Sequence, residues 1–163
     1  MRNFLLRASA ALVVALTLSG AIAAPAPLAP KPGWAIKPTA YAFAQLSGRL
    51  DKAIEDAKMN LVNSASASQG AKAQGIVIPG NRVVGVFRND FARRMLAASI
   101  PAGIEAPVRF YIVETSGGHA TLAYRTPSDV FAPYFIEGGA PLRDLARELD
   151  TIFAAIASQA TAP

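Results

Sequence analysis

Two β-rich runs that flank a glycine pair constrain the fold of this chain more than any other feature. The runs cover residues 107–114 (PVRFYIVE) and 120–125 (ATLAYR), and the segment between them, TSGGH, contains Gly117 and Gly118. Strands of this composition around a short connection containing glycine are typical of a β-hairpin. The sequence therefore predicts an antiparallel strand pair in which Val113 lies opposite about Ala120.

Strands and helices alternate along the rest of the chain. Aromatic or β-branched residues predict strands at residues 39–46, 60–66 and 83–88, and the small residues at 66–75 are expected to form a loop. Apolar residues at helical spacing predict helices at residues 47–58 and 89–99, with Ser47 and Asn89 as N-caps. A long third helix is expected to start at Pro141 and to bury a stripe formed by Leu142, Leu145, Leu149, Ile152, Phe153 and Ile156.

The resulting order, β-α-β-β-α-β-β-α, predicts an α+β fold in a single domain at residues 39–160. Such an order favours a two-layer sandwich, a largely antiparallel sheet with helices on one face. The second face of the sheet is then left without a helical layer. We expect it to expose Tyr111, Val113 and Tyr124 unless Trp34 or a second copy of the chain covers it, so a homodimer is one predicted partner state.

The first 23 residues have the pattern of an export signal. A basic start with Arg2 and Arg7 precedes an apolar run at residues 8–22, and Ala21-Ile22-Ala23 matches a signal-peptidase site, which predicts a mature start near Ala24. The apolar run is shorter than the roughly 20 residues of a membrane-spanning helix. We therefore expect a periplasmic or secreted protein with no membrane span after cleavage.

A proline-rich leader is expected at residues 24–38, between the signal and the domain. It contains Pro25, Pro27, Pro30, Pro32 and Pro38, and proline at this density favours extended backbone over helix. Trp34 lies within it, and we expect this side chain to dock on the domain, because a tryptophan left in water loses much apolar burial.

Composition excludes several function classes. Cysteine is absent, which excludes disulfides, thiolate metal ligands, cysteine catalysis and a lipidated cysteine anchor. His119 is the only histidine, so no metal site and no cofactor are expected; it is a ligand-binding candidate or a solvated turn residue. The formal net charge of +5 falls to +3 without Arg2 and Arg7, which does not indicate a nucleic-acid partner.

Arg88, Asn89 and Asp90, followed by Arg93 and Arg94, form the most suggestive polar cluster. Backbone N–H groups at a helix start, with arginines nearby, can bind an anion. The alternative is an ordinary N-cap followed by a solvated basic helix face. Both interpretations place this segment at the start of the second predicted helix.

Tyr111, Glu114 and Tyr124 are the other candidate ligand-binding residues. The predicted hairpin register brings Tyr111 and Tyr124 close together, where they either line a ligand site or pack across the sheet. Two functions remain open: a non-catalytic module that binds a small ligand or a protein, for which no catalytic residue is assigned, and a small hydrolase or isomerase with Glu114 and Tyr124 as acid and base.

Three stretches resemble the domain of unknown function 302 family. They are Val84–Asn89 (VGVFRN), 106–114 (APVRFYIVE) and 118–127 (GHATLAYRTP), so the resemblance centres on residues 83–127. After Asn89 the sequence departs from the family, which often continues with proline and a Gly-Thr pair. Since the family's own function is not established, the resemblance implies a fold rather than an activity.

Overall fold

The computed structural model describes residues 27–163, so the expected signal peptide and the mature start at Ala24 lie outside the described residues. In chain order the elements are β1 (Trp34–Ala42), α1 (Phe43–Asp56), β2 (Asn60–Ala65), α2 (Ala67–Ala73), β3 (Asn81–Phe87), α3 (Asn89–Ala98), the 3₁₀ helix η1 (Pro101–Glu105), β4 (Val108–Glu114), β5 (His119–Arg125), α4 (Pro127–Phe131), the 3₁₀ helix η2 (Ala132–Tyr134) and α5 (Phe135–Thr161).

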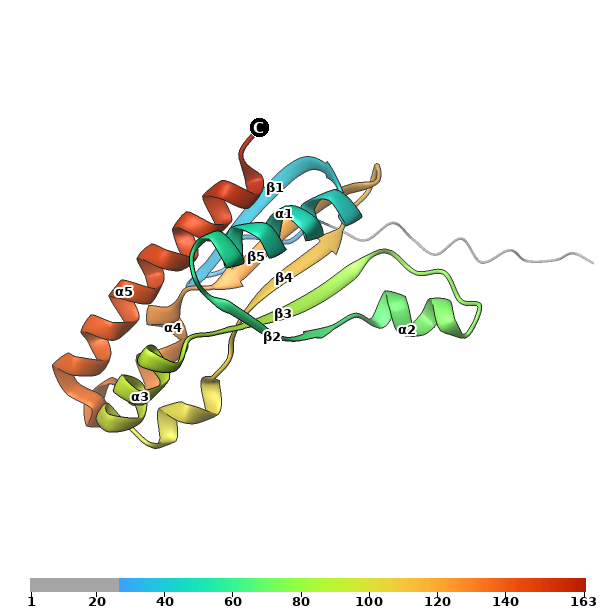
Figure 1. Ribbon diagram of the computed structural model, residues 1–163. Helices are drawn as coiled ribbons and strands as arrows, with labels where there is room; N and C mark the ends of the chain where they lie inside the picture. Colours follow the sequence, from blue (N-terminus) through green and yellow to red (C-terminus); the bar gives the residue numbers. More distant parts are fainter. Residues whose placement is uncertain (1–26) are drawn as a thin grey trace, which may run out of the picture.

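The strands form one sheet in the order β1-β5-β4-β3-β2, and every neighbouring pair is antiparallel. Helices α1 and α5 lie side by side against the sheet, while α2 lies beyond its end, on the connection between β2 and β3 (Figure 1). The predicted α+β fold, with its helices against an antiparallel sheet, is confirmed.

An aromatic cluster lies at the centre of the core between sheet and helices. The Phe110 ring stacks on the ring of Phe153 from α5, with ring centroids 4.6 Å apart, and meets the Tyr124 ring edge-on at 5.1 Å. Leu46 and Leu50 of α1 are fully buried beside the cluster. Alternate strand residues and the predicted stripe of the long helix thus share one apolar interior.

Strand β1 and helix α1 both start earlier than the sequence pattern predicted. β1 begins at Trp34, so residues 34–38 of the expected leader belong to the sheet, and Pro38 is tolerated because β1 is an edge strand. α1 begins at Phe43, since the core stripe of Leu46 and Leu50 continues back through that residue. Ser47 therefore lies inside the helix and is not its N-cap.

Two further predictions, one of a loop and one of a cap, were wrong. The segment expected to be a small-residue loop contains α2, whose N-cap Ser66 accepts a hydrogen bond from the Gln69 backbone N–H at 3.1 Å. No residue of α2 is buried, so no apolar stripe indicated it. In α3 the N-cap is Arg88, without a side-chain cap bond, and Asn89 is the first helical residue.

The β4–β5 hairpin is confirmed, but its register differs by one residue from the prediction. Val113 pairs with Thr121, not Ala120. Pairing Val113 with Ala120 would leave a two-residue loop, whereas here Thr115 N–H donates to the His119 carbonyl at 2.7 Å and closes a three-residue loop. A slip of one residue moves every side chain to the opposite face relative to its partner strand.

Helix α5 contains the predicted apolar stripe, after a break near its start. Gly139 has φ 57° and ψ −149°, a conformation open to glycine, and Pro141 follows the break at the start of the long segment, as expected. Leu142, Leu145 and Leu149 are buried in the core, together with Phe153 and Ile156.

Candidate functional site

The sheet face turned away from α1 and α5 is called the open face here. It presents one alternating set of strand residues, namely Trp34 and Ile36 from β1, Thr121, Ala123 and Arg125 from β5, Arg109, Tyr111 and Val113 from β4, and Val83, Gly85 and Phe87 from β3. The central strand β4 contributes Arg109, Tyr111 and Val113, and the small residues Gly85 and Ala123 lie on the strands to either side. The prediction that Arg109, Tyr111 and Val113 share this face is confirmed by the register.

A cavity of about 280 Å³ lies where β4 and β5 stop pairing. The last paired residues are Phe110 and Tyr124, and beyond them the chain turns into η1 on one side and α4 on the other. The cavity is lined by Trp34, Val83, Glu105, Val108, Arg109, Phe110, Tyr111, Tyr124, Arg125 and Val130. Buried apolar residues from the core thus form part of its wall, and open-face aromatic and charged residues form the rest.

Two arginines with different surroundings line this cavity. Arg125 donates from Nε to the Asp129 carboxylate at 2.8 Å, so α4 supplies its counter-charge. Arg109 is exposed, and none of the ion pairs between described residues includes it. Opposite Arg109 on β3 stands Gly85, where a Cβ would lie 2.1 Å from Asn63 Oδ1 and 2.8 Å from Pro107 Cγ, so the Asn63 amide and the Pro107 ring fill this place.

Trp34 reaches the cavity because the chain before β1 packs closely on α4. The Thr126 backbone N–H donates to the Gly33 carbonyl at 2.8 Å. Gly33 has φ +73°, and a Cβ there would lie 2.2 Å from Asp129 Oδ1, so only glycine permits this approach. Trp34 therefore docks on the domain as expected. Its side chain is half-buried on the open face, where Trp34 of β1 pairs with Arg125 of β5.

Tyr111 and Tyr124 lie on opposite faces of the sheet. The predicted cross-strand pair does not form, because the register places Tyr111 opposite Ala123 and Tyr124 opposite Phe110. Tyr124 is buried in the aromatic cluster and not exposed as expected, and this burial, with a smaller contribution from Asp150, raises the pKa of its phenol. Both tyrosines still line the cavity from its two sides.

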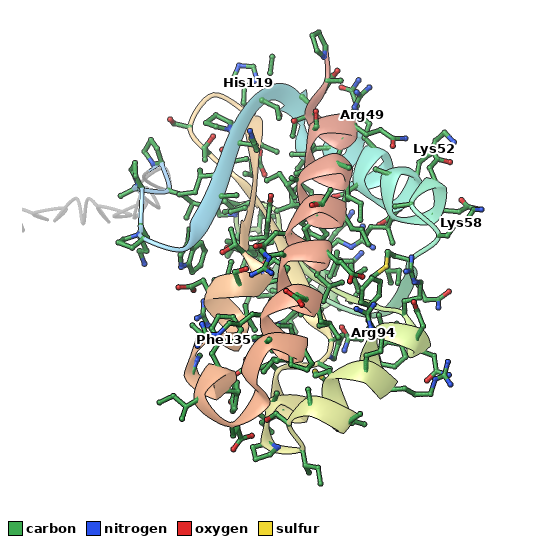
Figure 2. The ribbon with its side chains drawn as sticks, turned by 90° about the vertical axis from the view of Figure 1, so that its left-hand side faces the viewer. Arg49, Lys52, Lys58, Arg94, His119 and Phe135 are labelled. Atoms are coloured by element: carbon green, nitrogen blue, oxygen red, sulfur yellow. The ribbon has the colours of Figure 1, made fainter. Side chains whose placement is uncertain are left out.

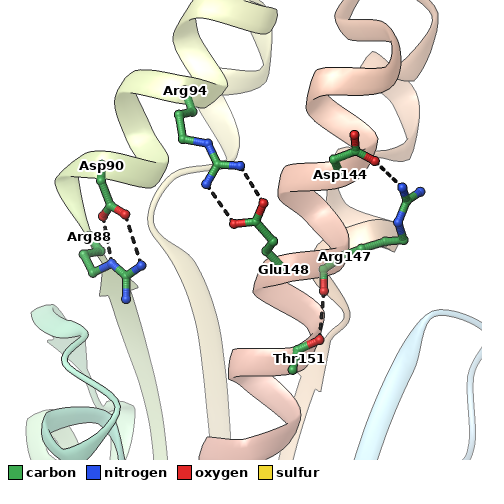
Figure 3. Close-up of polar contacts among 7 residues, drawn as sticks. All are labelled: Arg88, Asp90, Arg94, Asp144, Arg147, Glu148 and Thr151. Atoms are coloured by element: carbon green, nitrogen blue, oxygen red, sulfur yellow. Dashed lines mark hydrogen bonds and ion pairs between the residues drawn. The ribbon is translucent and has the colours of Figure 1, made fainter.

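The arginines around the start of α3 are occupied by carboxylates. Arg88 donates to both Asp90 oxygens, at 2.7 and 3.0 Å, and Arg94 makes the same two-fold contact with Glu148 of α5 (Figure 3). These hydrogen bonds raise the pKa of both arginines and lower the pKa of both acids. Asn89 is exposed beside them. The arrangement favours the solvated helix face over an anion site.

Glu114 and His119 lie at the other end of the hairpin. Glu114 Oε2 accepts from the Gly80 N–H at 2.7 Å, and His119 Nδ1 is 3.1 Å from the Ala40 carbonyl oxygen. His119 is exposed at the opposite end of the molecule from Phe135 (Figure 2). Glu114 pairs with Ala120, four residues from Tyr124, a span of about 13 Å along a strand. The structure therefore does not bring the expected acid and base together.

The part of the chain that the structure describes lacks two features. Within residues 27–163, no group of three or more His, Asp or Glu side chains is placed to hold a metal ion. Over the same residues, no helix combines the length and the apolar character needed to cross a bilayer.

The sequence indicated only part of this cavity. The alternation of side chains along the strand predicted that Arg109 and Tyr111 share one face of the sheet. Trp34 was predicted to dock on the domain. Arg125 and Glu105 were missed, because their place depends on where the β4–β5 pairing ends. The available signal was the Arg-Thr-Pro sequence at 125–127, which ends a strand and starts a helix.

Comparison with known proteins supports the family resemblance. A family model described as "Domain of unknown function DUF302" matches residues 36–158. Among solved structures, the fold is similar to the crystal structure of an uncharacterized conserved protein DUF302 from Bacillus stearothermophilus, with a TM-score of 0.69 and 12% sequence identity, over 80% of this chain and 99% of that chain. A search of curated proteins gave no match.

Proposed function

Because this chain belongs to the DUF302 family, whose description names no activity, we propose its function from its own site: it binds a small molecule with an aromatic or flat apolar body. This proposal rests on the cavity beside Trp34 and Tyr111, whose inner wall is formed by buried core residues. Ligand sites are commonly concave and apolar, with a few polar groups that fix orientation. This cavity has that composition.

The binding hypothesis is favoured over acid–base catalysis by the positions of the candidate residues. Tyr124 contributes a wall of the cavity, whereas Glu114 hydrogen-bonds the Gly80 backbone at the other end of the strands. General acid–base catalysis needs groups within hydrogen-bond reach of the same substrate. Binding needs only the aromatic walls, which are present.

The test combines a search for a carried ligand with a defined probe. Native mass spectrometry of the purified protein should reveal a bound molecule that is lost on denaturation. Calorimetric titration with 2-naphthamide, a neutral flat probe, should give measurable binding that Tyr111→Ala weakens at least about fivefold, since a stacked ring contributes on the order of 1 kcal/mol or more.

Tyr41→Ala is the matched control for that titration. Tyr41 is also half-buried, but its ring packs on the Arg49 guanidinium, 4.4 Å away, and it does not line the cavity. Its substitution should leave probe affinity unchanged. Equal losses in the two variants, or no binding of the probe by the wild-type protein together with no carried molecule, would contradict the proposal.

Self-association through the open face is a second proposal. It is supported by half-buried apolar side chains on that face, Ile36, Val83 and Val113, which no helix within residues 27–163 covers. Sedimentation of residues 24–163 should show a dimer at high micromolar concentration, and a monomer would contradict it. A version starting at Thr39 cannot serve as comparison, because it lacks the first half of β1.

Export is the third proposal, and it rests on the sequence of residues 1–23. The Ala-Ile-Ala site predicts cleavage before Ala24. N-terminal sequencing of the protein recovered from the periplasm or medium should begin at Ala24. An intact Met1 in the mature pool would contradict the assignment.

A further inference from the structure

The charges around the open-face cavity point to one class of ligand. We propose that the molecule bound there is an aromatic carboxylate, with its ring between Trp34 and Tyr111 and its carboxylate on the Arg109 guanidinium. The inference rests on the proposed function, because it names the chemistry of the ligand that the same cavity takes. It adds a requirement for negative charge that the aromatic walls alone do not impose.

Arg109 lacks a counter-charge among the described residues. It lies one residue outside the terminal Phe110–Tyr124 pair, and Arg125 occupies the corresponding position on β5, so two guanidinium groups line one side of the sheet. Like charges across neighbouring strands are unfavourable. Among the ion pairs of the described residues, Arg125 has Asp129 and Arg109 has none. A bound carboxylate would supply the missing negative charge.

Positive charges outnumber negative charges at the cavity and its rim. Asp129 accepts from Arg125 Nε at 2.8 Å, and Glu105 Oε1 accepts from the neutral Tyr134 hydroxyl at 3.0 Å. A further cation, Lys31, has its Nζ 5.4 Å from the centre of the Trp34 ring. Arg109, Arg125 and Lys31 thus face only the two carboxylates of Glu105 and Asp129, which leaves one positive charge in excess.

The aromatic side chains and the arginines of the cavity are neighbours on the open face. Tyr111 lies two residues from Arg109 on the same strand and face, and Trp34 pairs with Arg125 across the next strand. An aromatic ring held between Trp34 and Tyr111 would thus have a guanidinium at its edge. Arginine binds a carboxylate through two parallel N–H donors, which fixes the orientation of a flat molecule as well as its charge.

The test uses two probes that share one ring system and differ in charge. 2-Naphthoate carries the carboxylate and 2-naphthamide replaces it with a neutral amide. In calorimetric titrations the wild-type protein should bind 2-naphthoate at least about tenfold more tightly, the effect of one charge-assisted hydrogen-bond pair. Arg109→Gln should abolish this preference by lowering the affinity for 2-naphthoate far more than the affinity for 2-naphthamide, and Arg109→Lys should retain part of the preference.

Arg93→Gln is the matched control, because Arg93 is exposed on α3 and its loss changes the net charge equally. It should keep the preference. Equal affinity for both probes in the wild-type protein, or a preference that survives Arg109→Gln, would overturn this inference and leave the proposed function standing. Tighter binding of 2-naphthylmethylammonium would overturn it in favour of Glu105. Failure of all three probes to bind would overturn this inference, and only together with the absence of a carried molecule would it overturn the proposed function as well.

Discussion

The helix-covered face and the open face of the sheet consist of alternate residues of the same strands, yet their character is opposite. Within β4, Phe110 and Ile112 are fully buried against the helices, while Arg109 is exposed and Tyr111 half-buried on the open face. On the covered face, apolar side chains fill the space between sheet and helices. On the open face, aromatic and charged side chains surround a cavity.

This difference shows how one strand can serve stability and binding separately. Side chains in a strand alternate between faces, so a substitution on one face leaves the packing of the other largely intact. Tyr124 is the exception, since its ring belongs to the core cluster and also lines the cavity. Stability and binding are expected to be coupled at Tyr124 and separable at Tyr111 and Arg109.

The largest effect is expected for Phe153→Ala. Phe153 is fully buried and stacks on Phe110, so its truncation should lower the free energy of unfolding by about 3–5 kcal/mol. Tyr111→Ala on the open face should lower it by less than about 1 kcal/mol. Urea denaturation of both variants measures the difference. Comparable losses would mean that the open face also carries the fold, and the separation of the two faces would fail.

Gly33→Ala tests the contact that places Trp34 and Asp129 at the cavity. A residue other than glycine at φ +73° and a Cβ 2.2 Å from Asp129 Oδ1 should together destabilise the protein by about 1–3 kcal/mol. Gly48→Ala is the control, since a Cβ at Gly48 in α1 meets nothing within 4 Å, and it should stabilise by about 0.5–1 kcal/mol. Thermal unfolding of both variants provides the measurement, and a neutral Gly33→Ala would show that this approach is not tight.

Particular residues show how far the sequence could predict this fold and site. Alternation from Val108 assigned the faces of β4 correctly, because a strand's period is a local property. The register against β5 was off by one, since it depends on whether the glycine loop has two or three residues, which the Gly-Gly pair alone does not decide. Trp34 meets Arg125 through a strand pairing distant in sequence, which no local pattern encodes, whereas the Arg125–Asp129 ion pair joins residues four apart and is local.

Stability at high pH should report on Tyr124, the core residue that also lines the cavity. Burial raises the pKa of its phenol above the value of about 10 found in an unfolded chain. The stabilisation is fully present below pH 10 and is lost as the pH rises through the folded-state pKa, because the unfolded chain releases the proton first. The urea concentration at the midpoint of unfolding should fall with rising pH between about pH 9 and 11, and it should fall less steeply for Tyr124→Phe than for the wild-type protein. Parallel profiles would show that Tyr124 is not the group responsible.

The smallest effect is expected for Arg109→Gln, and its sign distinguishes a binding residue from a structural one. Without ligand, the Arg109 guanidinium lines the same cavity as Arg125 and has no carboxylate partner among the described residues. Its removal should raise the free energy of unfolding by about 0.2–0.5 kcal/mol at low ionic strength. The gain should disappear in about 1 M salt, where charges are screened beyond roughly 3 Å.

Arg93→Gln removes the same charge from α3 and should give no such gain. If Arg109→Gln instead destabilises the free protein, the side chain supports the fold, and the open face is not specialised for binding at this position.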